Sequence, residues 1–112
     1  MEISGRPPRI LIVDDSNALR ALIRRELAPL GVVTEEAENG KVALEVAARF
    51  APDFITLDLD MPVLDGYQTC EDLKAREATM HIPVLIVSAN PDDASRLRAL
   101  AAGAISTLRI AR

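Results

Sequence analysis

The segment ILIVDDSNALRALI at residues 10–23 decides the fold class, because its pattern changes halfway along. Its first four residues are apolar without alternation, which is typical of a parallel strand covered on both faces. After the acidic pair, apolar residues recur with the period of a helix at Leu19, Leu22, Ile23 and Leu27. We therefore predict one strand followed by one helix, which Ser16 or Asn17 can cap.

The same alternation of strand and helix repeats along the chain. Apolar runs at residues 54–57 and 84–87 predict two more strands, and the half-polar VVTEEA at 32–37 predicts an exposed edge strand. A last segment at residues 105–110 would be the fifth strand. Helical spacing follows each of the first four strands, Gly31 and Gly103 can end helices, and Pro83 can open a strand. Short, right-handed connections then predict an α/β fold with a doubly wound parallel sheet.

The composition supports one ordinary domain. The chain has 112 residues, of which 49% are hydrophobic and 27% are charged, and this is enough for one core. We expect a loose N-terminal tail at residues 1–8 and a single domain at residues 9–112. The net charge of −4 and the aromatic content of 3% argue against direct binding to nucleic acid. The sequence shows no membrane span or signal-peptide core, and its lone Cys70 suits a reducing compartment, so we expect a cytoplasmic protein.

Acidic residues follow two of the predicted strands. Asp14 and Asp15 come after the first strand, Asp58 ends the third, and Ser88 ends the fourth. If the strand order is 2-1-3-4-5, the first and third strands are neighbours, and three carboxylates meet at the carboxyl edge of the sheet. Each aspartate alone could simply cap a helix or start a loop. Together they repel one another unless a cation compensates, which favours a site for Mg²⁺, Mn²⁺ or Ca²⁺.

An ionised carboxylate beside such an ion can attack a phosphoryl group and form an aspartyl phosphate. Asp58 is the best candidate for this nucleophile because it stands at a strand end with other acids close by. Ser88 can then donate a hydrogen bond to a phosphoryl oxygen.

Four motifs in order, over residues 9–103, resemble the receiver domain of two-component response regulators: ILIVDDS (10–16), ITLDLDMPVLDG (55–66), PVLIVSA (83–89) and AAGA (101–104). The resemblance implies a five-stranded sheet of flavodoxin-like order 2-1-3-4-5. It implies a signalling switch rather than an enzyme, phosphorylated by a histidine kinase or a histidine phosphotransfer protein. It also implies these roles: Asp58 as phosphoacceptor, Asp14 and Asp15 as the acidic pair at Mg²⁺, the backbone carbonyl of Asp60 as a further metal ligand, and Ser88 as the switch hydroxyl.

The sequence departs from the family pattern in two ways. Ile110 stands where the family has a lysine, Arg109 is an imperfect substitute for it, and Thr107 replaces the aromatic switch residue. In addition, the fifth helix of the family is missing after the last strand. An apolar sheet face beside the first helix then lacks cover, which either a further part of a larger protein, a helix-supplying partner or a second copy in a homodimer would provide.

Two other functions compete with the phosphorylated switch. The first is a pseudo-receiver, a protein-interaction module with impaired switching, which Ile110 and Thr107 favour. The second is a phosphatase, because Asp58-Leu59-Asp60 resembles the nucleophile motif of haloacid dehalogenase-like enzymes. That chemistry needs a downstream lysine and a further acidic pair, whose only candidates are Lys74 and the pair at 92–93.

The first helix also carries Arg20, Arg24 and Arg25 beside the acidic site. We interpret them as one basic face, which is either simply solvated or used to dock a phosphodonor domain, as the family does with this helix.

Overall fold

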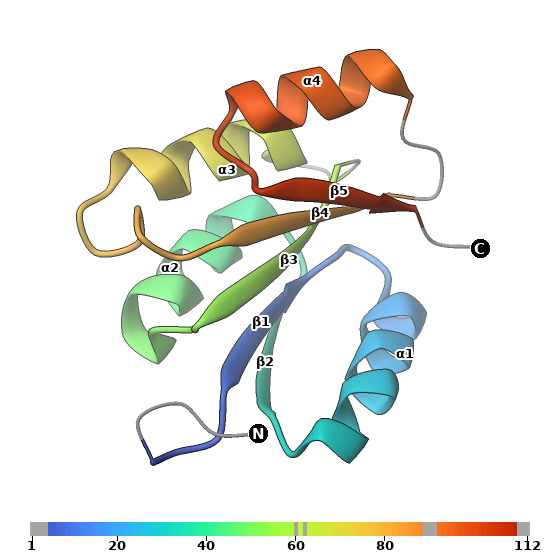
Figure 1. Cartoon of the computed structure of the whole chain (residues 1–112), viewed down its shortest axis with the longest axis vertical. Helices are drawn as coiled ribbons and strands as arrows, with labels where there is room; N and C mark the ends of the chain where they lie inside the picture. Colours follow the sequence, from blue (N-terminus) through green and yellow to red (C-terminus); the bar gives the residue numbers. More distant parts are fainter. Residues whose placement is uncertain (1–4, 60, 62, 89–91, 110–112) are drawn as a thin grey trace.

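The computed structural model describes residues 5–59, 61, 63–88 and 92–109, and its elements alternate between strand and helix (Figure 1). A single turn of 3-10 helix, η1, follows the first α-helix. In chain order the elements are β1 (Arg9–Val13), α1 (Asn17–Leu27), η1 (Ala28–Leu30), β2 (Val33–Ala37), α2 (Gly40–Phe50), β3 (Phe54–Asp58), α3 (Gly66–Ala75), β4 (Val84–Ser88), α4 (Asp93–Ala101) and β5 (Ser106–Arg109).

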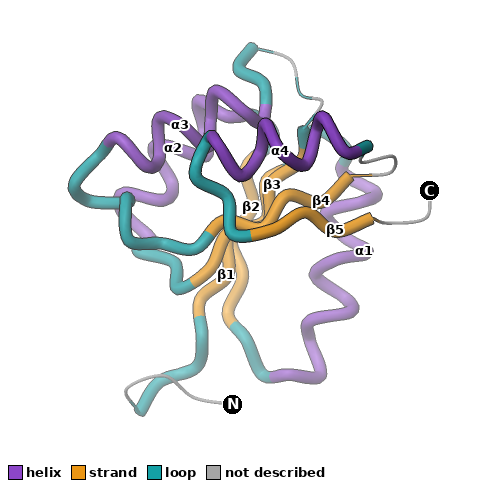
Figure 2. The backbone as a smooth tube through the Cα atoms, turned by 45° about the horizontal axis from the view of Figure 1, so that its top comes forward, coloured by secondary structure: helices purple, strands orange, loops and turns teal. Residues whose placement is uncertain are grey.

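The five strands form one parallel sheet in the order β2-β1-β3-β4-β5. The predicted α/β class, doubly wound sheet and strand order are therefore confirmed. Helix α1 lies on one face of the sheet, whereas α2, α3 and α4 lie on the other (Figures 1 and 2). Because the strands are parallel, their carboxyl ends meet at one edge, where the aspartates were expected to gather.

The main core lies between the sheet and helices α2, α3 and α4. Alternate residues of the three inner strands point into it, and the helices contribute mostly small side chains, so that they approach the sheet closely. Each fully buried Leu, Ile or Val contributes about 1.5–3 kcal/mol. The strand residues of this core are Leu11, Val13, Ile55, Leu57, Val84 and Ile86, and the helix residues include Ala43, Val46, Ala47, Cys70, Leu73 and Ala99.

The opposite face of the sheet has less cover. Ile12 is fully buried on this face, and Leu19 of α1 is buried as well. Phe54 and Leu85, which share the face of Ile12 through the strand register, are only partly buried. Among the described helices α1 alone packs here, which agrees with the expectation that this face is incompletely covered.

Side-chain caps begin the four described α-helices. Ser16 caps α1 by accepting a hydrogen bond from the N–H of Leu19 at 3.2 Å, which decides between the two predicted caps. The other caps are Asn39, Asp65 and Asp92. Gly31 has a φ of 72° at the end of η1 and Gly103 a φ of 107° just after α4, as their predicted places at helix ends require. None of the described helices combines the length and the apolar character that crossing a bilayer requires.

The segment before β1 is bonded to the start of β3 through Arg6 and Asp53. The guanidinium of Arg6 donates two hydrogen bonds to the two carboxylate oxygens of Asp53, both at 2.9 Å. The N–H of Arg9 donates to Asp53 Oδ2 at 2.8 Å, and the N–H of Asp53 donates back to the Arg9 carbonyl at 2.8 Å. The Arg6 guanidinium, and next the Arg9 N–H, hold the pKa of the Asp53 carboxyl below its ordinary value.

We predict that Asp53→Asn lowers the free energy of unfolding at neutral pH. Because the pKa of Asp53 is depressed in the folded state, its contribution is present above the unfolded pKa of about 3.9 and is lost as the pH falls through the folded value. The difference between wild type and variant should therefore shrink below about pH 4. Urea unfolding at a series of pH values measures it, with the exposed Glu45→Gln as control. A difference that stays constant across this pH range would contradict the prediction.

Candidate functional site

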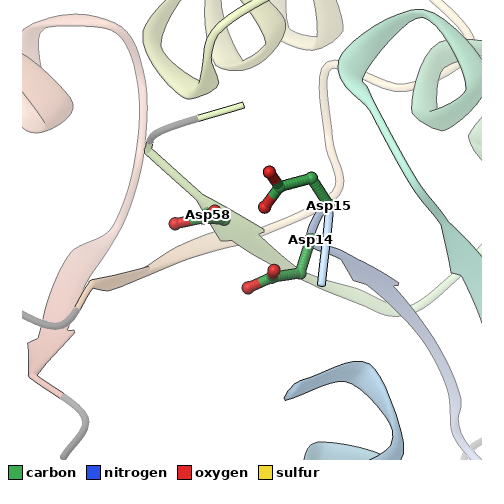
Figure 3. A group of neighbouring side chains, drawn as sticks. All are labelled: Asp14, Asp15 and Asp58. Atoms are coloured by element: carbon green, nitrogen blue, oxygen red, sulfur yellow. The ribbon is translucent and has the colours of Figure 1, made fainter. Parts of the chain in front are cut away.

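Three carboxylates gather at the carboxyl edge of the sheet (Figure 3). Asp14 and Asp15 directly follow β1, and Asp58 is the last residue of β3, the strand that pairs with β1. One carboxylate oxygen from each lies within 4.8 Å of the other two. Asp14 is 1% exposed and Asp58 is 4% exposed, whereas Asp15 is open to solvent. The structure thus brings together the three aspartates that the sequence placed at strand ends.

The position of Asp14 is fixed by hydrogen bonds at its backbone and its side chain. Its N–H donates to the carbonyl of Ala37 in β2 at 3.1 Å, and its carboxylate Oδ1 accepts from the N–H of Ser16 at 2.8 Å. Its carbonyl accepts a hydrogen bond from the guanidinium of Arg20. Ser16 also caps α1, so the same short turn starts the helix and orients the carboxylate.

The interpretation of Arg20 as part of a solvated basic face is wrong. Arg20 is only 8% exposed, and its guanidinium turns back to the end of β1 and across to β2, where its Nε donates to Glu36 Oε1 at 3.0 Å. Arg24 pairs with the other carboxylate oxygen of Glu36 and is half-exposed. Arg25 is exposed. A buried guanidinium needs hydrogen-bond acceptors, and here the turn after β1, the start of α1 and β2 provide them.

The sequence did contain a signal for this role of Arg20. Glu36 pairs in register with Ile12, so it lies on the same face of the sheet as α1. A carboxylate on this face of β2 is stabilised by a positively charged side chain from α1, which packs on the same face. The sequence alone did not say which of the three arginines would supply it.

The loop after Asp58 is tightly constrained by Gly66. The N–H of Gly66 donates to the carbonyl of Leu59 at 3.0 Å. A Cβ at this position would lie 2.3 Å from the Asp58 carbonyl oxygen and 2.7 Å from the Cα of Leu59. Both contacts involve backbone atoms, which do not give way as a flexible side chain would. Glycine is therefore needed here for close approach of the α3 start to the end of β3.

Val63 in the same loop has an unusual backbone conformation. Its φ is 73°, and its side chain is 77% exposed. β-Branched residues rarely adopt a left-handed conformation, because the Cβ then crowds the following carbonyl at a cost of about 1–2 kcal/mol. Val63 thus holds some backbone strain shortly before α3.

Ser88 is the last residue of β4, the neighbour of β3, and it is 6% exposed. It therefore ends at the same edge of the sheet as Asp58. Thr107 in β5 is partly buried and pairs in register with Ile86. Two residues weighed from the sequence, Asp60 and Ile110, lie outside the described residues, as does the side chain of Arg109.

The donor set fits a hard divalent cation. All three side chains offer carboxylate oxygens, the ligands that Mg²⁺ prefers, and oxygens on opposite sides of a bound Mg²⁺ lie about 4.2 Å apart. Adjacent oxygens of such an ion lie about 3 Å apart, so the three oxygens, which lie within 4.8 Å of one another, would draw closer around it. Since Asp15 is exposed, water and a phosphoryl group can reach the same position.

The structure disfavours the phosphatase interpretation. Lys74 lies at the end of α3, where its Nζ donates to the carbonyls of Met80 (3.2 Å) and Ile82, just before β4 begins. That is the amino edge of the sheet, opposite the acidic cluster. Asp92, a member of the second acidic pair, caps α4 by accepting from the N–H of Ser95 at 2.7 Å, and this bond lowers the pKa of its carboxyl. Lys74 is thus engaged at the opposite edge of the sheet, and Asp92 is used as a helix cap.

Comparisons with known proteins agree with this geometry. The family model described as "Response regulator receiver domain" matches residues 10–109. Response regulator MprA of Mycolicibacterium vanbaalenii is 40% identical over 98 residues, which are 88% of this chain and 42% of that protein. The chain spans less than half the length of the curated relatives it matches.

Two solved structures are similar over most of their length. The chemotaxis protein CheY4 of Vibrio cholerae is 26% identical with a TM-score of 0.87, over 92% of this chain and 86% of that one. The receiver domain of a sensor histidine kinase of Pseudomonas aeruginosa, solved with a magnesium ion coordinated in its active-site cleft, is 30% identical with a TM-score of 0.84, over 92% of this chain and 84% of that one.

We predict that Gly66→Ala destabilises the protein by about 1–3 kcal/mol, because the new Cβ forces the backbone at Asp58 and Leu59 to move. Urea unfolding gives the loss, and amide chemical shifts show whether it is centred on these two residues. Gly31→Ala is the control, because it has a positive φ but open space around it, at the far end of α1. It should lose stability while the amide shifts at Asp58 stay unchanged. Equal shifts at Asp58 in both variants would contradict the prediction.

Proposed function

Because the chain belongs to the receiver domain family of response regulators, we propose that it is a signalling switch that accepts a phosphoryl group on Asp58 in a Mg²⁺-dependent reaction. The observation that carries the proposal is the acidic cluster itself. Oxygens of Asp14, Asp15 and Asp58 lie within 4.8 Å of one another at the carboxyl edge of two adjacent strands. Such crowding of like charge is unfavourable unless the site serves to bind a cation.

The residues of the cluster would have different roles in binding the ion and accepting the phosphoryl group. Asp14 and Asp15 hold the ion, Asp58 contributes one oxygen to it, and by resemblance the backbone carbonyl of Asp60 is a further ligand. When bound, Mg²⁺ offsets the negative charge of the phosphoryl group and of the carboxylate that approaches it. The magnesium in the Pseudomonas aeruginosa receiver domain supports this choice of ion.

The phosphoryl donor would be a phosphohistidine on a histidine kinase or a phosphotransfer protein. A carboxylate oxygen of Asp58 attacks the phosphorus, an O–P bond forms, and the P–N bond to the donor histidine breaks. The electron pair of that bond stays on the imidazole, which takes up a proton. Ser88 lies at the end of β4, the neighbour of β3, and its hydroxyl donates a hydrogen bond to an oxygen of the transferred group.

A pseudo-receiver is the second candidate, favoured by one feature of the sequence. Ile110 stands where a lysine would pair with the acceptor and then with the phosphoryl group. Without this lysine, one charge-assisted hydrogen bond to the acceptor and the phosphoryl group is lost. The domain would then serve as a protein-interaction module whose surface changes little on phosphorylation.

We predict that Mg²⁺ binds at Asp14, Asp15 and Asp58 with a dissociation constant on the order of millimolar, because a few carboxylates hold an ion that keeps several of its waters. Amide chemical shifts followed during a Mg²⁺ titration give the affinity. Asp14→Asn should weaken binding, since it removes a charged ligand from the most buried position of the cluster. Amide shifts around the cluster that do not change up to tens of millimolar Mg²⁺ would rule out the site.

We predict that Asp58 is the single phosphorylation site. Wild type with Mg²⁺ and acetyl phosphate should gain the mass of one phosphoryl group, and Asp58→Asn should gain none. Asp65→Asn is the matched control: it removes a nearby carboxylate, yet asparagine still caps α3, so it should be phosphorylated like wild type. Phosphorylation of Asp58→Asn at undiminished yield would disprove the assignment. Wild type that binds Mg²⁺ but gains no phosphoryl group would favour the pseudo-receiver.

A further inference from the structure

The guanidinium of Arg20 joins three parts of the chain at the edge of the acidic cluster. Its Nη1 donates to the carbonyl of Asp14, its Nη2 to Oδ1 of Asn17, and its Nε to Oε1 of Glu36 at 3.0 Å. These acceptors belong to the turn after β1, the first residue of α1, and β2. All three types of guanidinium nitrogen are thus used, and the side chain is almost fully buried.

This arrangement fixes Asp14 independently of any bound ion. Its N–H is held by Ala37 of β2 and its carbonyl by Arg20, while the N–H of Ser16 holds its carboxylate. Arg20 is itself held on β2 through Glu36, so the peptide of Asp14 is anchored twice to the edge strand. The direction of the carboxylate depends on that peptide, because the side chain has only two rotatable bonds beyond it.

We propose that Arg20 is a positioning residue for cation binding: its guanidinium holds the Asp14 peptide, and thereby the acidic pair, in the geometry that Mg²⁺ requires. The inference rests on the proposed function for the identity of the ion. The positioning depends on contacts within the chain, so it is also tested separately, by a measurement made without Mg²⁺. Residues that orient metal ligands without touching the ion typically change affinity by about 10- to 100-fold when they are replaced.

Positioning and simple charge predict opposite results. Arg20 carries a positive charge next to a site for a divalent cation, so by Coulomb repulsion alone its removal would tighten Mg²⁺ binding. If Arg20 positions Asp14, its removal weakens binding. The sign of the change in affinity distinguishes the two effects.

The chain offers a matched control in Arg24. It pairs with the same Glu36, through the other carboxylate oxygen, and lies one helical turn further from Asp14 along α1. Arg24→Gln removes the same charge from the same helix and the same ion-pair partner. It leaves the Arg20 bond to the Asp14 carbonyl in place.

The experiment compares wild type, Arg20→Gln, Arg20→Lys and Arg24→Gln, at a temperature at which thermal unfolding shows all of them to be folded. The first readout is the Mg²⁺ dissociation constant from amide shifts. The second is hydrogen exchange of the Ser16 amide in metal-free protein, since this amide donates to the Asp14 carboxylate. We expect Arg20→Gln to bind Mg²⁺ about tenfold more weakly and to exchange the Ser16 amide faster. Arg24→Gln should match wild type within about twofold in both.

Arg20→Lys separates charge from geometry and remains informative if Arg20→Gln does not fold. Lysine keeps the charge, but its single ammonium lacks the planar fork that reaches three acceptors on separate elements. It should therefore weaken Mg²⁺ binding and speed Ser16 exchange as well. Wild-type affinity and exchange in Arg20→Lys, or unchanged or tighter Mg²⁺ binding in Arg20→Gln, would overturn the proposal. If wild type itself binds no Mg²⁺, the proposed function fails, and Ser16 exchange alone decides the role of Arg20.

Discussion

The pairing of β1 with β3 is the constraint on which the rest of the molecule depends. It aligns Val13 with Leu57 and so places Asp14 and Asp58 at neighbouring strand ends. Their carboxylate oxygens lie within 4.8 Å of each other, so when both are ionised they repel by about 3.5 kcal/mol or more at an effective dielectric constant of about 20. Burial of Leu11, Val13, Ile55 and Leu57 contributes about 6–12 kcal/mol, at about 1.5–3 kcal/mol each. The apolar pairing therefore prevails, and the repulsion is the energy that a cation can recover on binding.

The two edges of the sheet treat acidic residues in different ways. At the amino edge, the Asp53 carboxylate accepts hydrogen bonds from the Arg6 guanidinium and the Arg9 N–H, so its charge stabilises the fold. At the carboxyl edge, the chain gathers three carboxylates within reach of a single ion. The nearby guanidinium of Arg20 donates to a backbone carbonyl and to Glu36. The guanidinium beside the cluster thus bonds to the backbone and to a carboxylate outside the cluster.

The sequence predicted those features that depend on local patterns. Short apolar runs indicated most of the strands, and the resemblance to receiver domains implied the strand order. From that order followed the meeting of Asp14, Asp15 and Asp58. Features that depend on which long side chain reaches which distant partner were not predictable. Arg20 and Arg24 differ little in sequence context, yet only Arg20 is buried, because the distance from its place on α1 to both strands suits its length. The positive φ of Val63 also escaped prediction, since valine gives no signal for it and the loop imposes it.

The charges of β2 have a consequence for how copies of the chain meet one another. This strand is paired on one side only, and an open strand edge is a template on which further strands can add. Its Glu35 and Glu36 are engaged by Arg49 at 3.5 Å and by Arg20 and Arg24, which carry charged groups from α2 and α1 to this edge. An approaching strand would have to bury or displace these ion pairs. The arginines that brace the edge strand inside one molecule therefore also guard it against fibril-like stacking at high concentration.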